Sequence, residues 1–148
     1  MITTLTPVPA APEDAPAIAR ILSDWIDATP WMPRVHTREE DQGFGRMLVT
    51  RGWTQVVRAG GNAVGFLSRD GAEVHALYVA RTARGRGVGK ALLDQAKAAA
   101  PLLQLYTFQA NTAAQRFYLR EGFVEISRTD GAGNDEHLPD IRYEWRHA

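Results

Sequence analysis

The 148-residue sequence predicts a mixed α/β domain in which helices flank a mostly antiparallel sheet. Stretches with apolar residues at helical spacing alternate with short runs rich in β-branched and aromatic residues. Glycine-containing turns divide the middle of the chain into hairpins, and a strand-helix-strand order, typical of a parallel crossover, follows. No linker or internal repeat interrupts the chain, so we expect a single domain over residues 1–148.

The first third of the chain predicts one short strand and two helices. A β-like run at residues 2–6 is followed by prolines that stop it. Residues 13–28 carry apolar side chains at helical spacing, with Pro16 in the first turn, where proline is tolerated. Thr37 and Glu40 have the spacing of a capping box, which predicts a second helix from there to about residue 50.

Three strands are expected next, at residues 53–58, 63–68 and 73–79. Gly60-Gly61 and Asp70-Gly71 separate them, and both dipeptides are typical of tight hairpin turns. The three strands should therefore form an antiparallel meander.

A helix over residues 88–100 then leads to a strand at 102–108, which the crossover places parallel to the strand at 73–79. Thr112 and Gln115 have capping-box spacing and predict a further helix, for which Gly122 is a natural stop. Two closing strands, joined by a long polar loop, complete the expected order β-α-α-β-β-β-α-β-α-β-β, at residues 124–128 and 141–146.

Composition excludes several classes of function. Seventeen basic and seventeen acidic residues balance, which does not favour a nucleic-acid partner. The absence of cysteine rules out disulfides, thiolate metal sites and a cysteine nucleophile. No apolar run approaches the roughly 20 residues that span a bilayer, and the N-terminus lacks the basic start of a signal peptide. We therefore expect a cytoplasmic protein with no membrane association and no metal.

A glycine-rich stretch between a strand and a helix is the most informative local feature; it reads Arg84-Gly85-Arg86-Gly87-Val88-Gly89-Lys90. Missing side chains and the free N–H groups of a helix start would let a negative group approach closely, although a solvated basic turn has the same composition. It is not a Walker A loop, because Arg84 replaces the first glycine and Ala91 the final Ser or Thr. Rossmann spacing also fails, since the third glycine is missing.

The remaining pattern, Arg-x-x-Gly-x-Gly, resembles the acetyl-CoA loop of the GCN5-related N-acetyltransferase (GNAT) family, through Arg84, Gly87 and Gly89. A second segment resembles the family's Asn-x-x-Ala-x-x-Phe/Leu-Tyr-x-x-x-Gly-Phe signature, with matches at Asn111, Ala114, Phe117, Tyr118, Gly122 and Phe123. The resemblance covers roughly residues 53–146, whereas the first fifty residues fit only in the order of their elements.

The resemblance implies the GNAT fold, a mixed and mostly antiparallel sheet of six or seven strands flanked by about four helices. It also implies transfer of an acetyl group from acetyl-CoA to a primary amine, on a small molecule or peptide, by direct attack in a ternary complex. The residues that it would assign to acetyl-CoA are Leu77, Tyr78, Val79, Arg84, Gly85, Arg86, Gly87, Val88, Gly89, Lys90, Asn111, Ala114, Phe117 and Tyr118.

Catalysis by this route needs a proton donor for the leaving thiolate and a neutral amine. By resemblance, Tyr118 is the general acid, although a tyrosine at this place is also a common core residue. The base is left open between Glu73, His75 and water; alternation along the strand would put both side chains on one face with Leu77. In relatives that acetylate protein N-termini, the base would occupy the position that is Tyr106 in this chain. This departure from their pattern argues against a protein N-terminus as the acceptor.

The acceptor is the least determined part of the sequence. Trp25, Trp31 and Trp53 are candidates for an aromatic pocket, and Trp31, in a proline-flanked loop, is the better one. Acidic residues of the late loop could attract a cationic amine, or could simply be solvated; they are Asp130, Asp135, Glu136 and Asp140. The alternative function is a catalytically silent acyl-CoA-binding sensor or regulatory module, and whether the protein forms a homodimer is open.

Overall fold

A computed structural model of the chain describes residues 5–147. Part of the predicted first strand, residues 2–4, lies outside the described residues, and Leu5 and Thr6 are not in a strand. The first strand is instead β1 (Val8–Pro9), which pairs with β2. Its position was misjudged because proline was taken as a stop. At a sheet edge proline is compatible with a strand when its nitrogen faces away from the neighbouring strand.

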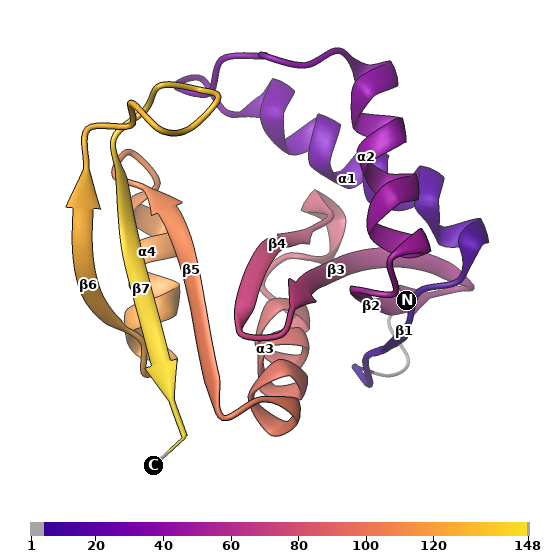
Figure 1. Cartoon of the computed structure of the whole chain (residues 1–148). Coiled ribbons are helices and arrows are strands. Elements are labelled where there is room, and N and C mark those ends of the chain that lie inside the picture. The colour runs from indigo at the N-terminus through magenta and orange to yellow at the C-terminus, as the bar shows by residue number, and fades with distance from the viewer. Residues whose placement is uncertain (1–4, 148) are drawn as a thin grey trace.

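The seven strands form one mixed sheet in the order β1-β2-β3-β4-β5-β7-β6 (Figure 1). The predicted antiparallel meander is confirmed as β2 (Thr54–Ala59), β3 (Asn62–Asp70) and β4 (Glu73–Val79). The second half of the sheet consists of β5 (Leu102–Phe108), β6 (Val124–Thr129) and β7 (Asp140–Arg146), which are also antiparallel to each other where they pair.

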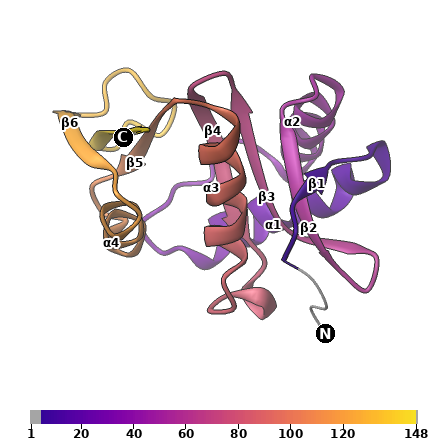
Figure 2. The ribbon, with the colours of Figure 1, turned by 90° about the horizontal axis from the view of Figure 1, so that it is seen from below.

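Helices cover both faces of the sheet (Figures 1 and 2). A short 3-10 turn, η1 (Pro12–Asp14), leads into α1 (Ala15–Ala28), which packs with α2 (Arg38–Thr50) on one face of β2–β4. A second 3-10 turn, η2 (Arg81–Ala83), precedes α3 (Val88–Ala99), which lies on the other face with α4 (Thr112–Arg120). We call these the α1/α2 face and the α3/α4 face of the sheet. A mixed, mostly antiparallel sheet flanked by helices confirms the predicted fold class.

Two apolar cores hold these layers together. On the α1/α2 face, Ile18 and Leu48 pack against Phe66 of β3, and all three are almost fully buried. On the α3/α4 face, Leu92 of α3 and Tyr143 of β7 belong to one continuous core. The core of the α3/α4 face includes residues of both β4 and β5, such as Val74 and Leu105, so it joins the two halves of the sheet.

Helix α3 lies close to β3 because β3 carries glycine at the contact. A Cβ placed on Gly65 would lie 2.6 Å from Cγ1 of Val88, at the start of α3. This distance is too short for a real contact, so glycine here fixes how closely the glycine-rich stretch approaches the sheet.

Of the two predicted capping boxes, the one at Thr37 is confirmed and the one at Thr112 is not. Thr37 caps α2 as predicted, accepting from the Glu40 N–H while the Glu40 carboxylate accepts from the Thr37 N–H. The predicted box at Thr112 is wrong, because Asn111 is the cap of α4 and its Oδ1 accepts from the N–H of Ala114 at 3.1 Å. Asparagine competes well for this position, and the Gln115 amide donates to the Phe108 and Gln109 carbonyls instead.

The predicted alternation along β4 is also wrong. Register between β3 and β4 shifts between Ser68 and Arg69, which leaves His75 as an extra residue in β4. Such a bulge changes which side chains share a face. Leu77 consequently contacts the core of the α3/α4 face, whereas His75 stacks on Trp53, which packs against the core of the α1/α2 face.

Candidate active site

The central cleft lies between the two parallel strands β4 and β5. They pair only at Glu73 and Gln104, near their N-terminal ends, and then diverge, as Figure 1 shows. The divergence leaves a cavity of about 400 Å³, which we call the interstrand cleft. Its walls come from Val74–Val79 of β4, Leu105–Phe108 of β5 and one side of α4, together with Trp25 of α1.

Backbone N–H groups of β4 face this cleft. The Ala80 N–H donates to the Val64 carbonyl of β3, so by strand alternation the N–H of Tyr78 also points to β3. The N–H groups of Leu77 and Val79 then point the other way, toward the diverging β5. Of the three predicted backbone donors, Leu77 and Val79 therefore have the orientation that a ligand in the cleft needs.

The glycine-rich stretch closes one end of the cleft. Gly85 and Gly87 have φ angles of 75° and 82°, in the left-handed region that only glycine enters readily. Gly87 is the N-cap of α3, and its carbonyl accepts the first intrahelical bond, from the Ala91 N–H. The N–H groups of Val88, Gly89 and Lys90 precede that bond and have no helical partner. They line a cavity of about 510 Å³.

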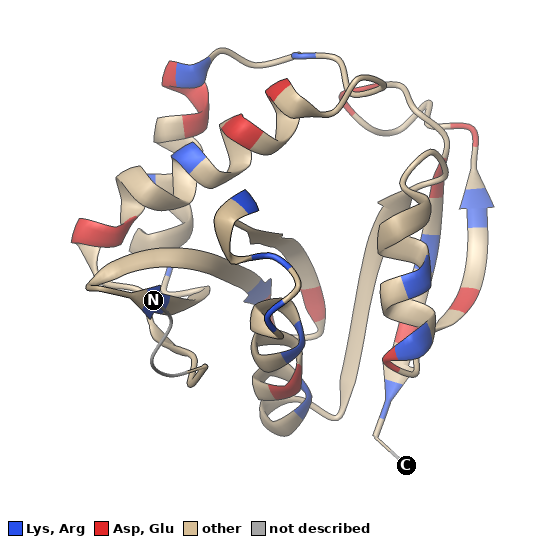
Figure 3. Cartoon of the chain, turned by 180° about the vertical axis from the view of Figure 1, so that it is seen from behind, with Lys and Arg blue, Asp and Glu red and all other residues tan. Residues whose placement is uncertain are grey.

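Basic side chains surround these N–H groups, and Figure 3 shows Lys and Arg along the segment that joins β4 to α3 and on α4. The Arg84 Nε donates to the Val79 carbonyl at 3.1 Å, which ties the stretch to the end of β4. Lys90 pairs with Glu121 at 3.0 Å, and that carboxylate raises its pKa. Positive charge and free N–H groups together make a site for a phosphate-like anion.

Tyr118 lies in the wall of the interstrand cleft, on α4. Its ring is only 8 % exposed and contacts Phe117, Phe123 and Tyr143. Its hydroxyl forms no hydrogen bond with any described residue. Burial raises the pKa of Tyr118 far above the usual value for a phenol, with the nearby Tyr78 adding to the effect. The hydroxyl therefore keeps its proton at neutral pH and is free to donate it.

Three further predicted residues from the second signature lie where α4 meets the cleft. Asn111 uses its Oδ1 as the helix cap, and its Nδ2 has no protein partner among residues 5–147. Ala114 lies one turn further along the cleft wall, and Phe117 contributes both to the cleft and to the cavity at the glycine-rich stretch. The Asn111 amide can thus cap α4 and still donate to a ligand.

Glu73 is not brought together with Tyr118. It lies at the paired end of β4 and β5, outside the residues that line the cleft. Both of its carboxylate oxygens accept from Arg142 of β7 at 2.8 Å, and this ion pair raises the pKa of the arginine. Arg142 also donates to the Gln104 amide oxygen. The geometry makes Glu73 part of a cross-strand ion pair rather than a base beside the cleft.

His75, the other candidate base, does line the cleft. Its ring is stacked on that of Trp53, with ring centroids 5.1 Å apart and ring planes 16° apart. The guanidinium of Arg51 also lies over the Trp53 ring. Trp53, which is outside the cleft, therefore holds the imidazole in a fixed orientation.

A second cavity, of about 580 Å³, adjoins the cleft on the α1/α2 face; we call it the side pocket. The two cavities share the lining residues Trp25, His75, Ala76, Tyr78, Tyr106 and Phe108, so they are neighbours. The predicted order of the two tryptophans is reversed. Trp25 lines both cavities, while Trp31 lines neither and packs edge-on against Trp25 and Phe108.

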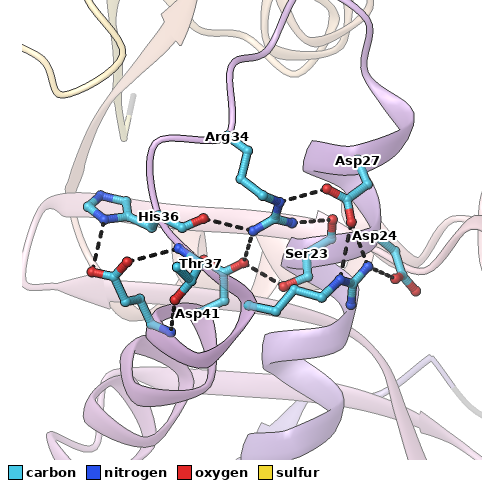
Figure 4. Close-up of polar contacts among 9 residues, drawn as sticks. Ser23, Asp24, Asp27, Arg34, His36, Thr37 and Asp41 are labelled. Carbon is cyan, nitrogen blue, oxygen red and sulfur yellow. Dashed lines mark hydrogen bonds and ion pairs between the residues drawn. The ribbon is translucent and has the colours of Figure 1, made fainter.

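The loop between α1 and α2 forms one wall of the side pocket, and a polar network fixes it (Figure 4). Arg34 donates to the carboxylates of Asp27 and Asp41 at 2.7 and 2.9 Å, and to the backbone carbonyls of Ser23 and His36. A single guanidinium thus joins α1, α2 and the loop between them.

The four acidic residues of the late loop have different roles. Asp140 is buried and accepts from the Thr129 hydroxyl and the Asn134 amide, which makes it structural. Asp130 accepts from the Ala132 N–H in a local turn. Asp135 and Glu136 line the side pocket. Among the described residues, no group of three histidine or acidic side chains has the arrangement of a metal site.

Comparison with known proteins identifies the family. Residues 51–125 match the family model described as an acetyltransferase (GNAT) domain, which is just over half of the chain. The chain belongs to the GNAT family. A peptidyl-lysine N-acetyltransferase of Escherichia coli, YiaC, is 37 % identical over 131 residues, which cover 84 % of this chain and 88 % of that relative. The predicted family and the predicted class of enzyme, an N-acetyltransferase, are confirmed.

Further proteins resemble this chain in sequence or in fold. The peptidyl-lysine N-acetyltransferase YjaB of Salmonella typhimurium is 36 % identical over 67 residues, and that match spans 45 % of this chain and 46 % of the relative. Among solved structures, the apo form of Escherichia coli YjaB has a TM-score of 0.79 at 24 % identity, over 97 % of this chain and 98 % of that one. YncA of Salmonella typhimurium, solved with acetyl-CoA, has a TM-score of 0.72 at 19 % identity, over 97 % of this chain and 94 % of that one.

The GNAT signatures did not point to Thr107, which the structure places in the cleft wall. Its hydroxyl is buried and has no hydrogen-bond partner among the described residues. Strand alternation with Leu103 and Leu105 could have predicted an inward side chain, but its hydroxyl gave no reason to expect a cleft rather than core.

No helix within residues 5–147 is long and apolar enough to span a membrane.

Proposed function

We propose that this GNAT protein transfers the acetyl group of acetyl-CoA to a primary amine, by direct attack while both substrates are bound. The observation that carries the proposal is the position of Tyr118, whose free hydroxyl lies in the wall of a cleft that ends at the glycine-rich anion site. Relatives named as peptidyl-lysine N-acetyltransferases support a lysine side chain, in a peptide or small molecule, as the acceptor.

The residues present fit the parts of acetyl-CoA. The free N–H groups at the start of α3, with Arg84 and Lys90 beside them, suit a pyrophosphate. The pantetheine arm carries amides, and an extended chain can bond the unpaired edges of β4 and β5 as an added strand does. Asn111 Nδ2 and the unpaired Thr107 hydroxyl are further polar partners along the same path.

Acetyl-CoA would supply a thioester, which is activated for attack by an amine. In this chain, the N–H groups of Leu77 and Val79 would hold the thioester oxygen and stabilise the negative charge that it gains during attack. Tyr118 would donate its phenolic proton to the departing sulfur. The usual pKa of a thiol is about 8.5. Burial in the same cleft would raise the pKa of the CoA thiol, as it raises that of the phenol.

The amine must lose a proton before it attacks. A free lysine side chain, with a pKa near 10.4, is deprotonated at pH 7 only about four times in ten thousand. Of the two predicted bases, we assign the role to His75, acting directly or through water. It lines both the cleft and the side pocket, whereas both carboxylate oxygens of Glu73 are bonded to Arg142.

Free-thiol release from acetyl-CoA, measured against a panel of amines that includes lysine peptides, tests the proposal. We expect saturable release with a lysine-containing acceptor and only slow hydrolysis without one. Tight binding of acetyl-CoA in calorimetry, with no thiol release from any amine, would instead identify a silent acyl-CoA-binding module.

A further inference from the structure

The side pocket has a chemical character of its own. Its walls are largely apolar and aromatic, with side chains such as Leu22, Trp25 and Phe44, yet four carboxylates also line it. No lysine or arginine lines it within residues 5–147. An apolar stem that ends in a positive charge would match such a pocket, because the stem would bury against the walls and the charge would face carboxylates.

Three of the four carboxylates already have partners. Glu40 completes the cap of α2, and Asp41 accepts from Ser23 and Arg34. Asp135 lies 3.3 Å from Nε2 of His36, a contact between the loop after α1 and the loop after β6. These groups gain less from a cationic ligand than an unpaired carboxylate would.

Glu136 is the exception. It is half-buried, lines the side pocket, and has no hydrogen bond or ion pair with any described residue. Its charge also acts on Tyr78: burial raises the pKa of that phenol to about 12, and the Glu136 carboxylate contributes to the rise. Tyr78 is one of the residues shared by the side pocket and the cleft. Glu136 therefore faces the place where an acceptor would pass toward the donor.

We propose that Glu136 determines acceptor specificity by attracting the ammonium group of a lysine-like amine into the side pocket, before that nitrogen loses its proton and attacks the thioester. This inference rests on the proposed acetyltransferase function and assigns its acceptor-recognition residue. Asp135, the residue before Glu136 in the loop, contacts His36 at 3.3 Å and so links this loop to the opposite wall of the pocket.

The test compares Glu136→Gln with Asp130→Asn, which removes the same charge from the same loop outside the side pocket. Two acceptors are used: Nα-acetyl-lysine amide, and its aminooxy analogue of equal length, whose terminal nitrogen is uncharged at neutral pH. Glu136→Gln should raise KM for the lysine amide about tenfold, as expected for loss of a partly exposed charged hydrogen bond, and leave KM for the analogue unchanged. Asp130→Asn should change neither value.

Binding supplies a readout that does not depend on turnover. Calorimetric titration of Nα-acetyl-lysine amide into protein saturated with CoA should show the same tenfold weakening in Glu136→Gln. If that weakening appears but no variant releases thiol from acetyl-CoA, the recognition role stands and the proposed reaction falls. If turnover is normal and Glu136→Gln binds both acceptors as the wild type does, or weakens both equally, the role of Glu136 is refuted while the reaction stands.

Discussion

Replacing Tyr118 by phenylalanine separates its role in chemistry from its role in packing. The ring contributes to the core of the α3/α4 face, where it contacts Phe117 and Phe123, and phenylalanine keeps those contacts. The hydroxyl has no hydrogen bond with a described residue, so its loss removes no native interaction. We therefore expect the free energy of unfolding of Tyr118→Phe to stay within about 0.5 kcal/mol of wild type.

The expected effect on turnover is much larger. A positioned general acid contributes roughly 10²–10⁴-fold to rate, which corresponds to about 2.7–5.5 kcal/mol in the activation free energy. Because the phenol donates only as the thiolate leaves, kcat should fall by that factor while KM for acetyl-CoA stays nearly constant. The raised pKa of Tyr118 also means that its proton is present throughout the neutral range, so the wild-type rate should not decline there through loss of this proton.

Steady-state thiol release and urea unfolding of the same preparations measure both quantities. Tyr143→Phe is the matched control, since it removes a hydroxyl from a buried tyrosine of the same core that does not line the cleft. Near-normal kcat in Tyr118→Phe would refute the assignment of the general acid. Equal losses of kcat in both variants would show that the effect arises from packing.

Three further predictions concern the frame of the site. Gly65→Ala should lower the free energy of unfolding by about 1–3 kcal/mol, because its Cβ would lie 2.6 Å from Cγ1 of Val88; an unchanged urea midpoint would contradict this. Glu73→Gln should keep more than a tenth of the wild-type kcat yet lose about 1–3 kcal/mol of stability, since Arg142 on β7 loses its charged partner and keeps only neutral acceptors such as Gln104; a hundredfold loss of kcat would restore Glu73 as the base. Asp135 raises the pKa of His36, so the charged imidazole stabilises the fold below about pH 6.5 and this contribution is lost as pH rises through the raised pKa. Nuclear magnetic resonance titration should show a lower His36 pKa in Asp135→Asn, and identical titration curves would argue against the contact.

Local sequence was sufficient for the donor half of the site. The left-handed turns at Gly85 and Gly87 and the helix that follows them are set by neighbouring residues, so a short motif could locate the N–H groups that we propose bind an anion. The same holds for Tyr118, which follows its helix cap Asn111 by seven positions. The error at Thr112 has a local cause too, since two adjacent residues both had a side chain suited to capping and asparagine was the stronger competitor.

Two features of the site depend on pairing between distant segments and could not be predicted from local sequence: the face on which His75 lies and the partner of Glu73. The bulge that moves His75 to the α1/α2 face arises from the register of β4 against β3, and alternation within β4 alone gives the wrong face. The partner that occupies Glu73 is Arg142, 69 positions away, on a strand whose place in the sheet had to be known first. Alternation with Leu77 therefore could not reveal that Glu73 lies at the paired end of β4 and β5, bonded to Arg142.

The same division between local and distant contacts separates the two halves of the proposed site. The donor half is built from the segment 74–118, whereas the side pocket depends on the contact between His36 and Asp135, which are 99 positions apart. Substitutions in either of those two loops change the shape and charge of the pocket without altering the N–H groups at the start of α3 or the hydroxyl of Tyr118. If the proposed roles are correct, substitutions near Glu136 would change the acceptor while leaving the reaction the same.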